Sequence, residues 1–182
     1  MGTTYETILV AAPLDAVEAV IRAVGRDATV RQIAGERILV DTEDRPRGLA
    51  MEITERTGRP AFTTFVFDSD VVECRMYAGG ARVHRYVSDI GMLVEMFEDE
   101  DGVFRSMLDG RVLADGESPS GPIGADPAWF MPFAMGEVDP ERVRAALLAC
   151  KEYTFAEEHH DAILNSLGLP SYNSGSTPPA SS

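Results

Sequence analysis

The first half of the chain opens with a strand-like pattern followed by a helix-like one. Residues 5–12 form a β-rich apolar run. Apolar residues then recur at helical spacing between 14 and 24, with Pro13 at a plausible first helical position and Gly25 at the end. These patterns predict a strand at 5–12 and a helix at 14–24.

The pattern then returns to short strands. Residues 29–33 and 37–41 have strand-like composition and are separated by a three-residue loop containing Gly35. Leu49 and Ile53 share a helical face, and the stretch ends in Gly58-Arg59-Pro60, as helices commonly do. We therefore predict two strands and a helix at 49–57.

Residues 60–89 carry the clearest β signal. A two-residue turn at Gly79-Gly80 predicts a hairpin with an apolar and a polar face. The predicted pairs are Tyr77 with Arg82, Met76 with Val83, Cys74 with Arg85, and Val72 with Val87. This register places Arg85 among apolar neighbours. We therefore expect either an edge position or a carboxylate partner, such as Asp68, Asp70 or Asp89.

Beyond residue 89 the pattern weakens until the C-terminal helices. A short helix at 92–97 and loops at 98–101 and 115–127 are the best interpretations.

Asp139-Pro140-Glu141 caps a helix that continues to about residue 150. A capping box at residues 154–157 opens a second helix, with Phe155, Ala162, Ile163 and Leu167 as its apolar face, and Gly168-Leu169-Pro170 ends it.

The order of elements predicts an α+β fold. It is a ferredoxin-like β-α-β-β-α-β start, extended by a β-hairpin in an antiparallel or mixed sheet and followed by a C-terminal helix pair. The length of 182 residues suits one domain, assigned to 1–170. Residues 171–182 contain too few apolar residues to order themselves and predict a disordered tail.

Composition narrows the class of function. The 30 acidic and 16 basic residues give a formal charge of −14, which opposes binding to nucleic acid or an anionic membrane and attracts a basic partner. No stretch is apolar enough to span a membrane. Cys74 and Cys150 suit a reduced, cytoplasmic protein, and no cofactor motif is present.

Three segments, FDSD, HRYVSD after the Gly-Gly turn, and FAEEHHDAILNSLGLP, together resemble a group of small uncharacterised actinobacterial proteins with no established activity. The resemblance extends over residues 5–170. It implies a single domain and brings no catalytic residue with it.

Asp68-Ser69-Asp70 is the first candidate for chemistry. Its D-x-D spacing is similar to the metal–nucleotide site of glycosyltransferases and to the first motif of haloacid-dehalogenase phosphatases. In either case Asp68 and Asp70 would be catalytic or metal-binding. The parts that such enzymes also need are missing, so a turn before Val71 is the favoured interpretation.

Two further clusters are candidate ligand sites. Glu157 and His160 have the Glu-x-x-His spacing of di-iron proteins, but no second pair exists, and a charged helix face is the favoured interpretation. The polar face of the hairpin gathers residues that would suit a small anion or ligand: Arg75, Arg82, His84 and Tyr86.

The leading functional hypothesis is a non-enzymatic protein that binds a basic partner, such as an immunity-like inhibitor or a regulatory partner. The run from Trp129 to Phe133 is either a lid on the core or a contact patch. The predicted partner surface comprises Trp129, Phe130, Phe133, Glu98, Asp99, Glu100 and Asp101. The alternatives are a metal-dependent enzyme for phosphoryl or glycosyl transfer, and a small-ligand-binding domain.

Overall fold

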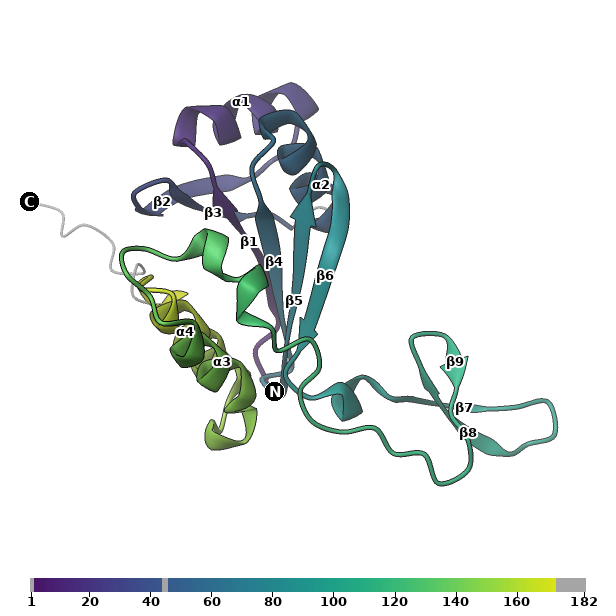
Figure 1. Ribbon diagram of the computed structural model, residues 1–182. Helices are drawn as coiled ribbons and strands as arrows, with labels where there is room; N and C mark the ends of the chain where they lie inside the picture. The colour runs from purple at the N-terminus through teal and green to yellow at the C-terminus, as the bar shows by residue number, and fades with distance from the viewer. Residues whose placement is uncertain (1, 44–45, 173–182) are drawn as a thin grey trace, which may run out of the picture.

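A six-stranded sheet runs through the computed structural model, which describes residues 2–43 and 46–172 (Figure 1). The strands lie in the order β2-β3-β1-β4-β5-β6, and every neighbouring pair is antiparallel. Their bounds are β1 Tyr5–Ala11, β2 Thr29–Ala34, β3 Arg37–Asp41, β4 Ala61–Phe67, β5 Val71–Ala78 and β6 Ala81–Val87.

The first four strands have the predicted ferredoxin-like arrangement. Helix α1 (Leu14–Val24) connects β1 to β2, and helix α2 (Pro46–Thr57) connects β3 to β4. Strand β3 lies between β1 and β2, and strand β1 lies between β3 and β4. The α+β class and the hairpin extension are confirmed, although α2 begins at Pro46 and not at Leu49.

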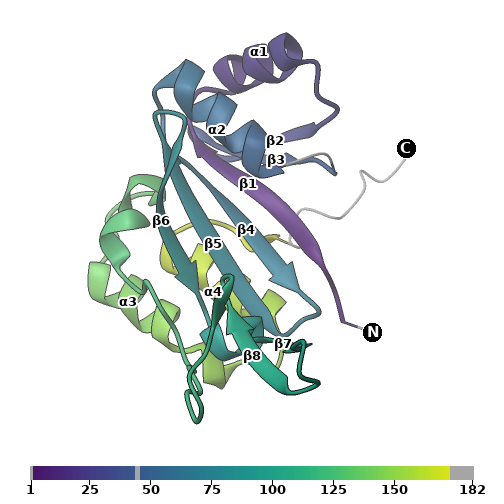
Figure 2. The ribbon, with the colours of Figure 1, turned by 90° about the vertical axis from the view of Figure 1, so that its right-hand side faces the viewer.

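Helices cover both faces of the sheet (Figures 1 and 2). Because side chains alternate along a strand, Ile8 and Val10 of β1 pack with α1 and α2, whereas Leu9 packs in the opposite layer. That layer contains α3 (Pro140–Leu148), α4 (Ala156–Ser166) and the 3-10 turns η2 (Pro127–Trp129) and η3 (Met131–Phe133). None of the helices in the described ranges is long and apolar enough to cross a membrane.

The β5–β6 hairpin departs from its predicted register through a bulge. Tyr77 pairs with Arg82 as expected, but Met76 then pairs with His84, which leaves Val83 as the extra residue. Cys74 pairs with Tyr86, and Val87 pairs with Glu73. A one-residue shift moves every later side chain to the other face. The predicted pair of Tyr77 with Arg82 is therefore confirmed, and the three predicted pairs further from the turn are wrong.

The bulge gives Arg85 a carboxylate partner, but not one of those predicted. Its guanidinium contacts the buried carboxylate of Glu73 and also that of Asp109. Arg75 binds Glu73 too, at 2.9 Å, and Arg47 of α2 approaches it at 3.8 Å. This sheet face thus contains one buried acid among three arginines.

A second, three-stranded sheet projects from the end of the first (Figures 1 and 2). It consists of β7 (Glu95–Glu98), β8 (Phe104–Leu108) and β9 (Arg111–Val112), and we call residues 95–117 the arm. The predicted helix at 92–97 is wrong, because a 3-10 turn η1 (Ile90–Leu93) ends there and β7 follows. Leu108 and Leu93 pack against a small cluster of Val71, Val87 and Ile90 at the base of the arm.

The C-terminal helix pair forms as predicted, with shifted details. The carboxylate of Asp139 caps α3 by accepting from the Glu141 amide at 2.9 Å. Helix α4 begins at Ala156, and Glu158, not Glu157, reaches back to the amide of residue 155. A short 3-10 turn, η4 (Cys150–Glu152), separates the two helices.

The face of α4 that packs on the sheet also differs from the predicted one. Ile163 and Leu167 are buried as expected, whereas Phe155 is 53% exposed. His159 and His160 are buried, so the interpretation of this segment as a charged surface is wrong.

The chain remains ordered slightly beyond the predicted domain end. Gly168, at φ 73°, reverses the chain after α4, and the Leu169 amide donates to the Leu164 carbonyl. The ring of Tyr172 then stacks on Tyr5 with centroids 4.8 Å apart. The remainder of the predicted tail, residues 173–182, lies outside the described residues.

Candidate functional site

The Asp68-Ser69-Asp70 segment is the tight turn between β4 and β5. Asp68 and Ser69 have φ values of 48° and 60°, and the Asp70 amide donates to the Phe67 carbonyl at 2.9 Å. Asp and Ser favour such turns. The Asp68 carboxylate accepts from the Gly2 amide, so it fastens the N-terminal segment to the turn.

The structure joins this turn to the second candidate motif, but through a serine. The Ser69 hydroxyl donates to Glu157 at 2.7 Å, and the Ser69 carbonyl accepts from the Ala156 amide. Burial raises the pKa of the Glu157 carboxyl, but hydrogen bonds from Ser69, from its own backbone amide and from Thr3 outweigh burial, and the pKa is lowered. The turn therefore anchors the N-terminus of α4.

His160 makes a different contact, with Tyr5. Its Nδ1 lies 2.8 Å from the Tyr5 hydroxyl, and burial lowers its pKa to about 3. Among residues 2–43 and 46–172, no group of three His, Cys, Asp or Glu side chains is placed to hold a metal ion. Asp68, Asp70, Glu157 and His160 therefore do not form a common site.

The predicted ligand site on the hairpin is divided between the two faces of the sheet. Arg75 lies on the α1/α2 face, bound to Glu73, and Arg82 is exposed near the turn. Tyr86 is buried on the other face, where its hydroxyl donates to the Leu147 carbonyl at 2.7 Å. His84 shares that face, stacked on Trp129. The bulge therefore separates residues that regular alternation would have grouped.

The aromatic run resolves into a core part and a surface part. Phe130 and Phe133 are fully buried against Phe62, so they are unavailable to a partner. Trp129 is 39% exposed, and its stacking on His84 places it on the face that α3 and α4 cover. The lid interpretation holds for the two phenylalanines.

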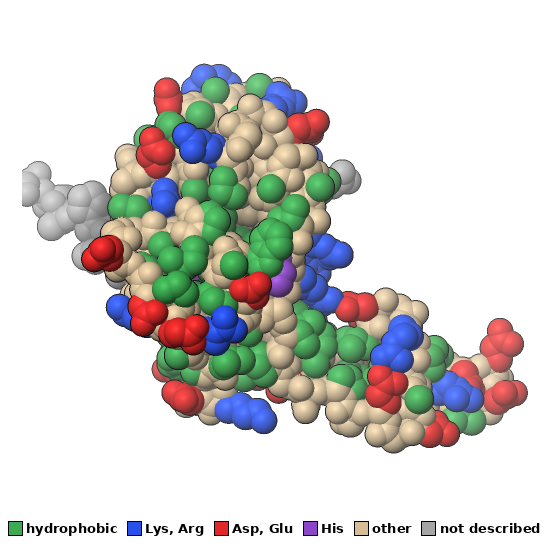
Figure 3. Space-filling view, viewed as in Figure 1, with side chains coloured by type: hydrophobic (Ala, Val, Ile, Leu, Met, Phe, Trp, Pro, Cys, Tyr) green, Lys and Arg blue, Asp and Glu red, His purple; other side chains and the backbone are tan. Residues whose placement is uncertain are grey.

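The predicted acidic residues lie elsewhere, at the tip of the β7–β8 hairpin (Figure 3). Glu98 ends β7, and Asp99, Glu100 and Asp101 form the connection to β8. The arm packs on the α1/α2 side of the sheet through Leu108, opposite the face of Trp129. The acids and Trp129 are thus on different sides, and the predicted joint surface does not form.

The arm instead exposes apolar side chains of its own. Met96 and Phe104 are 70% and 68% exposed, the largest exposed fractions among the large hydrophobic side chains of residues 2–43 and 46–172. Met96 pairs with Ser106 and Glu98 pairs with Phe104, so Met96 and Phe104 are diagonal neighbours on one face of the small sheet. The short runs EMFE and VFRSM, each with apolar and aromatic residues, lie on either side of an acidic turn that contains Gly102, and this is the sequence signal that would have identified the hairpin.

The electrostatics of the arm are strongly negative. Residues 95–117 contain eight acids and two arginines. Arg105 pairs with Asp99, and Arg111 pairs with Glu117. These hydrogen bonds lower the pKa of Asp99 and lower that of Glu117 to about 2. The carboxylates of Glu95, Glu98, Glu100 and Asp101 make no ion pair within the described ranges.

Comparisons of the chain with protein-family models, with curated proteins and with solved structures found no match. The geometry of the site is therefore the basis for a functional proposal.

Proposed function

We propose that this chain is an acidic interaction protein that binds a basic partner protein through its arm. It would act as an immunity-like inhibitor or a regulatory partner. The observation that supports the proposal is the pairing of exposed Met96 and Phe104 on one face of a projecting, strongly negative sheet.

The two kinds of residue have different roles in such a complex. Exposed methionine and aromatic side chains are typical anchors of interfaces, because they bury apolar area when the partner docks. Unpaired carboxylates at the hairpin tip attract a positively charged protein from a distance and accelerate association. The arm combines both features within residues 95–104.

The test is affinity capture from the native host with three forms of the protein. The wild type is compared with a Met96→Ser/Phe104→Ser double variant and with a Leu148→Ser control. Leu148 is 52% exposed on α3, so the control removes exposed apolar area away from the arm. A captured protein is then purified and its dissociation constant measured at two salt concentrations.

A basic protein that binds the wild type and the control, but not the double variant, supports the proposal. Its association rate should fall with added salt, because ions screen the carboxylates. Equal binding by all three forms, or no specific partner, contradicts it.

A further inference from the structure

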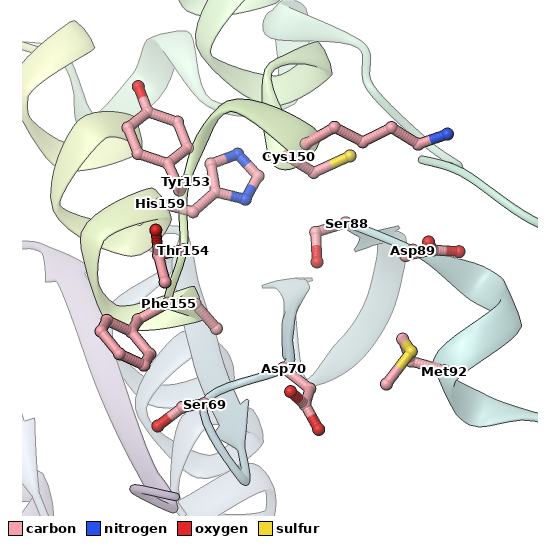
Figure 4. A pocket seen from close by; sticks show the side chains of 12 residues that line it. Ser69, Asp70, Ser88, Asp89, Met92, Cys150, Tyr153, Thr154, Phe155 and His159 are labelled. Atoms are coloured by element: carbon pink, nitrogen blue, oxygen red, sulfur yellow. The ribbon is translucent and has the colours of Figure 1, made fainter.

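A separate cleft lies between the β4–β5 turn, the end of β6 and the start of α4 (Figure 4). Its volume is about 160 Å³. A cavity of about 150 Å³ accommodates a ligand the size of benzene. Asp70, Ser88, Asp89, Met92, Phe155 and His159 are among the residues that line it.

His159 presents an unused acceptor to this cleft. The side chain is 2% exposed, and its Nε2 lies 2.8 Å from the Ala146 carbonyl. A carbonyl oxygen only accepts, so Nε2 carries the proton, and the neutral ring has a lone pair on Nδ1. Burial lowers the pKa of His159, which favours this neutral form. Nδ1 has no partner among the described residues.

The two carboxylates that line the cleft are also acceptors. The carboxylate of Asp70 makes no hydrogen bond or ion pair in the described part of the chain. Asp89 uses one oxygen, Oδ1, to hold the amides of Gly91 and Gly121. Lys151 also lines the cleft, but it forms no ion pair with either carboxylate. The cleft therefore has two carboxylates against one lysine, and it keeps free acceptors and a net negative charge.

Apolar side chains flank the same cleft. Met92 is 48% exposed and Phe155 is 53% exposed. Figure 4 shows the ring of His159 between Tyr153 and Cys150, on the opposite side of the cleft from Asp70. The acceptors are not grouped closely enough to hold a single metal ion. A larger, planar donor with several N–H groups satisfies such separated acceptors.

We infer that this cleft binds the guanidinium group of an organic cation. Asp70 supplies the charge, His159 Nδ1 accepts an N–H at the buried end, and Met92 and Phe155 cover the methylene groups of the ligand. The guanidinium belongs either to a small molecule or to an arginine side chain of another protein. The inference is independent of the arm and of its proposed partner.

The test is an NMR titration of the full-length, ¹⁵N-labelled protein with ethylguanidinium chloride. Saturable shifts of the amides of Asp70, Ser88 and His159 are expected, together with a shift of the His159 Nδ1 resonance as it accepts a hydrogen bond. Asp70→Asn should weaken binding by about tenfold, the value of one charge-assisted hydrogen bond. Asp101→Asn removes the same charge on the arm and should leave binding unchanged.

N-acetyl-arginine methylamide distinguishes the two sources. Tighter binding of this probe than of ethylguanidinium supports a protein side chain, and the reverse supports a small molecule. Shifts that do not saturate, equal shifts with propionate, or unchanged affinity in Asp70→Asn would overturn the inference.

Discussion

The body of the protein and its arm both contain strands whose successive side chains face opposite sides of a sheet. The two regions differ in how those sides are covered. In the body, helical layers cover both faces of the six-stranded sheet, so alternating residues such as Ile8 and Leu9 are both buried. In the arm, only the base is covered, through Leu108, and Met96 and Phe104 remain exposed. Apolar residues therefore stabilise the fold in one region and are available for binding in the other.

The largest expected effect separates two neighbouring aromatic residues of the body. Phe130→Ala should lower the free energy of unfolding by about 3–5 kcal/mol, because it leaves a cavity beside Phe62 and Tyr86. Trp129→Ala should cost less than about 1.5 kcal/mol, since the tryptophan is partly exposed and loses mainly its stack on His84. Urea denaturation measures both, and similar losses would contradict the division between core and surface.

A smaller loss is expected at the buried acid of the sheet. Glu73→Gln should lower stability by about 3 kcal/mol, because Arg75 and Arg85 lose their shared counter-charge. Glu98→Gln on the arm makes the same chemical change in an exposed, unpaired position. It should alter stability by less than about 0.5 kcal/mol. Equal values for the two variants would show that burial of Glu73 is unimportant.

Acid should destabilise the body through His160. Its folded pKa of about 3 is below the unfolded value of about 6.5, so the unfolded state binds more protons between these values. Stability is fully present above pH 6.5 and falls as pH decreases toward 3. From pH 7 to 5.5 the loss from this group is about 1 kcal/mol.

The check is urea denaturation of the wild type and His160→Gln at the two pH values. The variant is less stable at pH 7, because it loses the packing of the ring and its contact with Tyr5. Its stability should depend less on pH than that of the wild type. An identical pH dependence in the two proteins would contradict the assignment.

The smallest effect on stability belongs to the exposed face of the arm. Met96→Ser/Phe104→Ser should change the free energy of unfolding by less than about 0.5 kcal/mol, because these side chains already contact water. Calorimetric unfolding measures this change. A marked loss of stability would mean that the two residues support the fold, and the contrast between arm and body would disappear.

The sequence by itself determined most of the fold. Helical spacing and stop residues located α1 and the end of α2, strand-like runs located the first strands, and the Gly79-Gly80 turn located the β5–β6 hairpin. These signals are local: each depends on residues within one turn of helix or one pair of strands. The order of elements was then enough to give the ferredoxin-like start.

The tertiary structure decided which residues are buried and which meet. The bulge at Val83 places Arg85 beside Glu73, and no local residue pattern predicts the bulge. His159 and His160 look like surface residues in a charged run, yet carbonyl and hydroxyl partners from α3 and β1 make their burial possible. The arm was missed as a sheet because its strands are short, and its exposed face exists only because no helix covers it. Burial depends on partners distant in sequence, and only the folded chain brings them together.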